Sequence, residues 1–282
     1  MPLAISDLFM HNVMYIEMLN DGHKKIGSAT GFLYGFCDSA DGSVLCLVTN
    51  RHVLSHCAYI KLSFTLATES GNPDIGNLIE VELSTKDSIL HPTISIDLAI
   101  LPLGGAIKAI NNTGKRVFYA RFTSENIPSE NEWRNFSAME NVFMAGFPKG
   151  FRDDVNNQPI IRKGITATHP ALDFKGSPEF LVDMPCYEGC SGSPVFICDE
   201  GLIFDKSSRS VSAGSKVRLL GVQYAIPSQY VIGQLATVPT AGAKDVPVIP
   251  LYLNLGFIIK SSELMIFEDI LSARLTLVAK SK

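Results

Sequence analysis

The segment Gly189–Pro194, which reads Gly-Cys-Ser-Gly-Ser-Pro, has the residue types of a turn that exposes a nucleophile. Glycines on both sides of Ser191 permit a tight turn and leave backbone N–H groups free to converge on one point. The apolar run Val195–Ile197 follows directly, so the turn leads into a strand. This arrangement suits acyl transfer to a serine hydroxyl. Because a hydroxyl alone is a weak nucleophile, the chemistry also needs a histidine base and a carboxylate that orients it.

His52 and Asp97 are the candidates for those two roles. Of the six histidines, only His52 stands at the end of a strongly strand-like run, which begins at Val44, and is followed by a turn. Asp97 directly precedes the apolar run Leu98–Leu101. An unpaired carboxylate is costly in such surroundings, and a histidine partner would explain its position. The chain order His52, Asp97, Ser191 is one of the known orders of a catalytic triad.

Other interpretations of these residues remain open. The Gly189–Pro194 segment is also compatible with a plain turn between strands, with His52 and Asp97 as structural residues. Cys190 is an alternative nucleophile, since a thiolate near a histidine is reactive, but the flanking glycines favour Ser191. A zinc site built from Cys186, Cys190 and Cys198 is disfavoured because these cysteines lack a tight Cys-x-x-Cys pair.

The elements that must position these residues are strands. Short apolar runs rich in β-branched and aromatic residues recur along the chain, separated by Gly, Pro, Asn and Asp. This pattern predicts an all-β protein rather than βαβ units, which need amphipathic helices between strands. The expected strands are Ser28–Cys37, Ser43–Val48, Ala58–Phe64, Leu78–Leu83, Leu98–Leu103, Asn141–Gly146, Ile160–Ala167, Phe180–Met184, Pro194–Cys198, Val217–Ile226 and Leu251–Ile259.

A polar segment, Arg121–Asn135, separates two strand-rich halves of similar size and indicates an interdomain crossover. We therefore expect an N-terminal domain over residues 1–120, a crossover over 121–137 and a C-terminal domain over 138–282. Near the end, the apolar spacing after Ser262 predicts a helix over Ser262–Ser272 that packs on the second half. The segment Pro239–Pro250 is expected to be a loop.

Composition narrows the class of protein. In 282 residues, 46% are hydrophobic and 18% charged, a balance that supports a sizeable core. The net charge of −4 gives no global attraction to nucleic acid or an anionic membrane. The first residues do not form a signal peptide, and no apolar stretch is long enough to span a bilayer, so we expect a cytoplasmic protein with reduced cysteines.

Five segments together resemble the successive landmarks of trypsin-like serine peptidases, in the same order and with similar spacing. The HtrA/Deg branch is the most similar one, because two late segments and the following helix resemble its last strands and closing helix. The landmarks are Gly27–Phe32, Val48–Val53, Asp97–Leu101, Ala145–Gly150 and Gly189–Pro194, and the late segments are Leu220–Ala225 and Asn254–Phe257.

The resemblance implies two six-stranded antiparallel β-barrels with a C-terminal helix and a catalytic cleft between the barrels. It implies a serine endopeptidase in which Ser191 attacks a polypeptide, His52 acts as general base and Asp97 orients His52. The N–H groups of Gly189 and Ser191 would form the oxyanion hole. No cofactor or metal is expected. Because HtrA relatives are often oligomeric, a homo-oligomer or an activating partner protein is a further expectation.

Some positions depart from the resemblance. Cys190 stands where trypsin has an aspartate that pairs with a newly cut amino terminus, so activation by that ion pair is not expected. Val53 replaces a disulfide cysteine of secreted relatives. HtrA proteins generally carry a peptide-binding PDZ domain, and none is expected after the helix. A second hypothesis is therefore a trypsin-fold module of little or no turnover that serves in protein binding or regulation.

The residues that contact substrate are expected in the strands around the turn. We assign Met184, Gly221, Gln223 and Tyr224 to substrate binding. Asp183 or Glu188 facing the specificity pocket would favour a basic substrate side chain, whereas Met184 and Tyr224 would favour an apolar one. Pro185 interrupts the strand register, so alternation does not decide between them. We expect a small or medium apolar side chain.

Overall fold

The N-terminal half of the chain folds into one antiparallel sheet in the computed structural model, which describes residues 4–39, 42–205, 208–232 and 248–280. The strand order is β5-β4-β1-β2-β3-β7-β6, and the long strand β2 pairs with both β1 and β3. Alternating and near-continuous apolar runs form these strands because one face or both faces are buried. The strands are β1 (Val13–Leu19), β2 (Lys25–Ser39), β3 (Gly42–Thr49), β4 (Tyr59–Ala67), β5 (Pro73–Ser84), β6 (Ile89–Leu90) and β7 (Ala99–Pro102).

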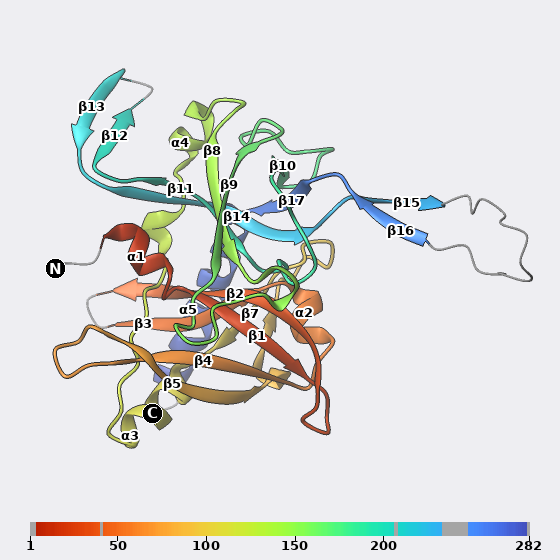
Figure 1. The fold of residues 1–282 in the computed structure, drawn as a ribbon. Coiled ribbons are helices and arrows are strands. Elements are labelled where there is room, and N and C mark those ends of the chain that lie inside the picture. The colour runs from red at the N-terminus through yellow and green to blue at the C-terminus, as the bar shows by residue number, and fades with distance from the viewer. Residues whose placement is uncertain (1–3, 40–41, 206–207, 233–247, 281–282) are drawn as a thin grey trace, which may run out of the picture.

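The C-terminal half is a closed six-stranded barrel with the strand order β10-β17-β14-β11-β8-β9. Closure removes exposed strand edges and lets the inward side chains fill the interior. Figure 1 shows the barrel lying against the first sheet, with their strands crossing. The barrel strands are β8 (Asn141–Gly146), β9 (Ile160–Thr166), β10 (Glu179–Asp183), β11 (Pro194–Asp199), β14 (Lys216–Ala225) and β17 (Leu255–Lys260).

Two hairpins project from the barrel in Figure 1. They are formed by β12 (Leu202–Asp205) with β13 (Ser210–Ala213), and by β15 (Ser228–Ile232) with β16 (Val248–Tyr252). The helices are short except the last one. They are α1 (Ile5–Phe9), α2 (Arg51–Ser55), α3 (Gly104–Asn112), α4 (Glu130–Asn135) and α5 (Met265–Lys280), with 3-10 turns η1 (Thr85–Asp87), η2 (Ser124–Asn126), η3 (Pro148–Gly150) and η4 (Ser261–Leu264). Among the helices within these described ranges, none is long and apolar enough to cross a membrane.

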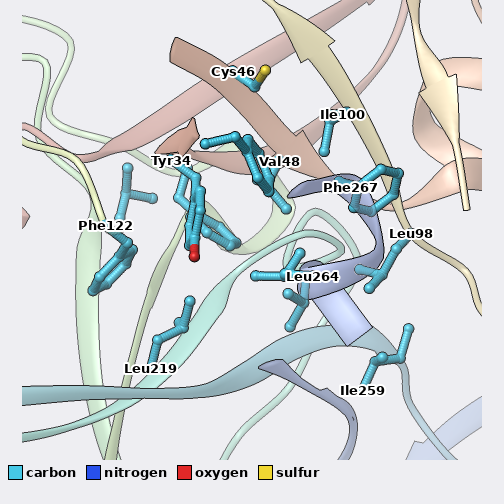
Figure 2. Close-up of a cluster of buried hydrophobic side chains, with 14 of the residues drawn as sticks. Tyr34, Cys46, Val48, Leu98, Ile100, Phe122, Leu219, Ile259, Leu264 and Phe267 are labelled. Carbon is cyan, nitrogen blue, oxygen red and sulfur yellow. The ribbon is translucent and has the colours of Figure 1, made fainter. Parts of the chain in front are cut away.

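The largest buried cluster joins the two halves through the C-terminal helix. Figure 2 shows Leu264 and Phe267 lying between Ile100 of the first half and Leu219 and Ile259 of the barrel. Leu264 and Phe267 are fully buried. Fully burying one such apolar side chain contributes roughly 1.5–3 kcal/mol. The halves are therefore fixed to each other by a shared core.

The expected all-β class with trypsin-like β units and a C-terminal helix is confirmed, and the first unit has the seven strands named above. All eleven expected strands overlap observed ones, but Leu251–Ile259 is split between β16 and β17. Strand β1 was not expected from the sequence. The expected helix begins one residue earlier, as η4, and continues through α5 to Lys280. The loop prediction for Pro239–Pro250 lies mostly outside the described residues, and its last part is the start of β16.

The domain boundaries stay a prediction. The first sheet ends with β7 and the barrel begins with β8. Between them lie α3, η2 and α4, and α4 begins with a capping box in which Ser129 and Glu132 exchange hydrogen bonds. The polar composition of Arg121–Asn135 thus corresponds to short helices that connect two sheets.

Candidate active site

His52 is placed by the end of β3. Thr49 is the last residue of that strand, Asn50 is extended, and α2 then turns the chain so that His52 lies on its first turn. Thr49 pairs with Ala99 of β7, and Asp97 comes two residues before Ala99. The Asn50 side-chain amide donates to the Asp97 carbonyl oxygen at 2.8 Å. The β3–β7 ladder therefore brings His52 and Asp97 to the same sheet edge.

The His52 and Asp97 side chains form a two-point contact. His52 Nδ1 lies 2.5 Å from Asp97 Oδ2, and the His52 backbone N–H donates to Asp97 Oδ1 at 2.9 Å. Burial acts to raise the pKa of Asp97, but the hydrogen bonds from His52 outweigh it and lower the pKa below its ordinary value. An ionised Asp97 accepts a hydrogen bond from His52 Nδ1–H, which leaves His52 Nε2 available as a base.

The turn Gly189–Pro194 depends on its two glycines. Gly189 and Gly192 have φ angles of +85° and +87°, a region that side chains disfavour. A Cβ atom on Gly189 would lie 2.6 Å from the Phe147 carbonyl oxygen, and one on Gly192 would lie 2.0 Å from the Thr30 carbonyl oxygen. Both glycines are therefore required by close backbone approach as well as by conformation.

Thr30 of β2 connects the turn to the first half of the chain. Its N–H donates to the Ser191 carbonyl oxygen at 2.9 Å, and its hydroxyl donates to the Gly189 carbonyl oxygen at 2.8 Å. The Thr49 hydroxyl in turn donates to the Thr30 carbonyl oxygen at 2.7 Å. Because Thr49 lies just before His52, these bonds hold the turn of Ser191 beside the end of β3. No local pattern in the sequence predicts these roles of Thr30 and Thr49.

Two backbone donors in the turn are left without an acceptor. In the described part of the chain, the N–H groups of Gly189 and Ser191 donate no hydrogen bond to the protein. The neighbouring Glu188 carbonyl oxygen instead accepts from Lys149 N–H at 2.6 Å. That bond keeps the carbonyl away from the two donors. The turn thus offers two N–H groups to an oxygen atom that develops negative charge.

Ser191 is partly exposed. Within the described ranges, Ser191 Oγ and His52 Nε2 make no hydrogen bond to each other. Catalytic hydrogen bonds are often long before substrate binds, so geometry of this kind is compatible with a base and a nucleophile. The predicted triad members thus lie on three neighbouring segments, with His52 on α2, Asp97 just before β7 and Ser191 in the turn before β11, and their catalytic roles stay a prediction.

The four predicted substrate-binding residues fall into two environments. Met184 is 2% exposed and packs inside the barrel, and a Cβ atom on Gly221 would lie 2.1 Å from the Ile259 carbonyl oxygen. Gln223 and Tyr224 lie next to the turn, because Gly192 N–H donates to the Gln223 carbonyl oxygen at 2.8 Å. The Tyr224 hydroxyl lies 2.5 Å from Glu179 Oε2. Their contact with substrate stays a prediction.

The alternative roles of the cysteines can be compared with the structure. Cys190 is fully buried, and its sulfur accepts a hydrogen bond from Arg162. All six cysteines are free thiols. Burial raises the pKa of the Cys186 thiol to about 12. No group of three His, Cys, Asp or Glu side chains in the described segments is arranged to hold a metal ion.

Comparison with known proteins gives one sequence match. A family model for a trypsin-like peptidase domain matches residues 29–203, which include His52, Asp97 and Ser191. No curated protein matches the sequence significantly. The match does not distinguish the HtrA branch from other members, so that finer resemblance stays a prediction.

Three solved structures align with most of the chain. A protease from M. tuberculosis in its active form is 14% identical, with a TM-score of 0.41 over 91% of this chain and 78% of that one. A protein named GrC is 15% identical, with a TM-score of 0.47 over 95% and 97%. HL collagenase is 12% identical, with a TM-score of 0.48 over 93% and 94%.

Proposed function

Because the chain belongs to the trypsin-like peptidase family, we propose that it is a serine endopeptidase that cleaves polypeptides through an acyl-enzyme formed on Ser191. The observation that carries the proposal is the coincidence of three features at one junction. These are the His52–Asp97 contact, the partly exposed Ser191 and the two free N–H groups of Gly189 and Ser191. Each is a part that acyl transfer requires.

The reaction follows from this arrangement. Ser191 Oγ attacks the peptide carbonyl carbon while its proton passes to His52 Nε2, and the carbonyl oxygen becomes an oxyanion. The N–H groups of Gly189 and Ser191 donate to that oxyanion, and losing one such donor typically costs about 10²–10³ in rate. The C–N bond then breaks, and His52 gives its proton to the leaving amine. Water, deprotonated by His52, hydrolyses the ester and restores Ser191.

Asp97 supports both proton transfers. Its carboxylate fixes the His52 ring through Nδ1 and the backbone of His52 through N–H. It also stabilises the imidazolium that forms when His52 accepts the Ser191 proton. Asp97 stays ionised throughout, which agrees with its lowered pKa.

The strand β14 offers a place for the substrate backbone. The pairing of β14 with β11 ends at Val222. Among the described residues, no strand pairs with Tyr224 and Ala225 on the β11 side of β14. A peptide added there as a further strand would lie beside the Ser191 turn. We propose that Tyr224 binds substrate in this way and that Gln223, whose N–H and carbonyl groups bond to Ser193 and Gly192, holds this part of β14 beside the turn. We also propose that the substrate carries a small or medium apolar side chain at the cleavage site.

A fluorophosphonate probe tests the proposal, because it reacts with a serine hydroxyl only when base and oxyanion donors are in place. We expect covalent labelling of the native chain and its loss in Ser191→Ala. Ser193→Ala is the matched control, since the buried Ser193 hydroxyl in the same turn makes no hydrogen bond. A well-folded chain that the probe does not label would favour the second candidate, a trypsin-fold binding module.

Cleavage profiling on a diverse peptide library would then report specificity. We expect cleavage after small or medium apolar residues. Cleavage after arginine or lysine would instead assign Asp183 or Glu188 to the specificity pocket. Native mass measurement with and without substrate tests the proposal of a homo-oligomer or an activating partner, which a fully active monomer would contradict.

A further inference from the structure

Strand β9 presents an arginine to the interior of the second barrel. Along the strand, Ile161 and Ile165 are 41% and 38% exposed, whereas Arg162 and Gly164 face inward. The partner strand agrees with this register, because Arg162 pairs with Met144, which is fully buried. A shift by one residue would bury the isoleucines and expose the arginine. The observed register therefore turns a partly buried arginine inward and leaves two isoleucines exposed.

The Arg162 guanidinium contacts both ends of the segment that leads to the nucleophile. Its Nη1 donates to the Pro185 carbonyl oxygen, and its Nη2 donates to Cys190 Sγ at 3.1 Å. Pro185 begins this segment, and Cys190 directly precedes Ser191. The positive charge of Arg162 also acts on the thiol of Cys186, where it opposes the rise in pKa that burial causes.

The same segment lacks ladder support from β9. Pairing between β10 and β9 ends at Asp183, and Met184 is held by a single bond to the Asn254 carbonyl oxygen. Beyond that point the strand partner no longer fixes the backbone. Arg162 lies on β9 beyond the end of its pairing with β10, and its side chain contacts the Pro185–Cys190 segment that follows β10. Hydrogen bonds from the Arg162 side chain thus replace the missing strand pairing.

We infer that Arg162 is a positioning residue that holds the Pro185–Cys190 segment and thereby sets the direction of the Gly189 and Ser191 N–H groups. A charge-assisted bond to the Pro185 carbonyl fixes one end, and the bond to the buried Cys190 thiol fixes the other. Arg162 acts through this segment and does not touch substrate. The inference rests on the proposed peptidase function for its effect on rate.

Kinetics of Arg162→Gln test the inference, with Lys163→Gln as matched control. Lys163 is the next residue of β9 and is exposed, so both variants remove one positive charge from the same strand. For Arg162→Gln we expect kcat and the rate of fluorophosphonate labelling to fall about 10- to 100-fold with KM nearly unchanged, because the oxyanion donors act mainly in the transition state. Lys163→Gln should leave both values within about twofold.

Two further variants keep the test decisive if Arg162→Gln folds poorly. Arg162→Lys retains the charge but lacks the guanidinium fork, so it should keep only part of the rate. Cys190→Ala removes one of the two contacts, and its effect should not add to that of Arg162→Lys, since both changes disturb the same pair. A folded Arg162 variant with unchanged kcat, or one with only a raised KM, overturns the inference.

Hydrogen exchange separates this inference from the proposed function. Removing the guanidinium should speed amide exchange in peptides spanning residues 185–192, while Lys163→Gln should not. If the native chain is unlabelled by the probe but exchange still responds, the peptidase proposal fails and the positioning of the segment stands. If the chain is active but neither exchange nor kcat responds, the inference about Arg162 fails alone.

Discussion

Replacing Gly192 with alanine should destabilise the protein far more than the same change at another left-handed glycine. Gly192 has a φ angle of +87°, and a Cβ atom there would lie 2.0 Å from the Thr30 carbonyl oxygen and 2.4 Å from Thr49 Oγ1. Thr30 and Thr49 belong to the first half of the chain, whereas Gly192 belongs to the second. The substitution therefore pushes against the junction that places Ser191 beside His52.

The expected magnitude follows from three costs. A non-glycine residue in the left-handed region costs roughly 1–2 kcal/mol. Forcing an extra carbon into packed surroundings costs about 1–3 kcal/mol. If Thr49 moves away, its buried 2.7 Å bond to the Thr30 carbonyl oxygen is lost, at about 1–3 kcal/mol. We expect a total loss on the order of 3–8 kcal/mol, a large share of the ~5–15 kcal/mol that stabilises a typical domain.

Urea unfolding of Gly192→Ala and Gly176→Ala measures the difference. Gly176 has a similar φ angle of +80°, but a Cβ atom there would meet nothing within 4 Å. Gly176→Ala should therefore show the conformational cost alone, about 1–2 kcal/mol. If Gly192→Ala does not fold, Thr49→Val tests the hydrogen bond separately and should cost about 1–3 kcal/mol.

The comparison also has a clear negative result. If the free energies of unfolding of Gly192→Ala and Gly176→Ala agree within about 0.5 kcal/mol, the close approach between the turn and Thr30 does not contribute to stability. The contact between Gly192 and Thr30 would then not be what joins the two halves at the site. Fluorophosphonate labelling of the folded fraction gives an independent reading, since we expect Gly192→Ala to react more slowly than Gly176→Ala.

Three other changes have defined outcomes. Asp97→Asn should lower kcat/KM by about 10⁴ at nearly unchanged melting temperature, because the amide does not hold the required His52 tautomer; steady-state kinetics with a cleaved peptide would show this, and a loss below tenfold would contradict it. Thr30→Val should cost about 1–3 kcal/mol in urea unfolding and slow labelling, since it removes the hydroxyl that bonds Gly189 and Phe147, whereas Thr30→Ser should not. Burial opposes ionisation of Glu132, but Lys216 and Ser129 lower its pKa to about 2. Glu132→Gln should therefore lose about 1–2 kcal/mol of stability at pH 7, a difference that is complete above about pH 4.5 and shrinks as pH falls toward 2; an equal loss at pH 7 and pH 3 would refute it.

Local signals made the strands and the candidate triad predictable. His52 follows a β-branched run and Ser191 lies between glycines, so each could be selected from its neighbours along the chain. Strand β1 gave no such signal, because apolar residues occupy both of its faces and its pairing with β2 and β4 buries most of them. Burial on both faces removes the alternation that identifies a strand.

Contacts between distant segments could not be predicted in this way. Thr30 lies in Gly27–Phe32, one of the segments that resemble trypsin-like peptidases. Its bond to Gly189, however, depends on how the two halves of the chain meet. Arg162 lies close to two isoleucines, Ile161 and Ile165, and the sequence alone does not predict that the arginine faces inward while both isoleucines are exposed. The burial of Gly221 against the Ile259 carbonyl likewise comes from the pairing of β14 with β17, which the sequence pattern does not specify.

The shared core under the C-terminal helix has a consequence for the newly made chain. Synthesis runs from the amino terminus, and the N-terminal part of a protein generally folds first. Here His52 and Asp97 emerge early, but Leu264 and Phe267, which fill the core between the halves, follow Ser191 in the sequence. A chain still on the ribosome therefore lacks the packing that fixes the junction. We therefore expect the junction that holds Ser191 beside His52 to become fixed only after Leu264 and Phe267 have been synthesised.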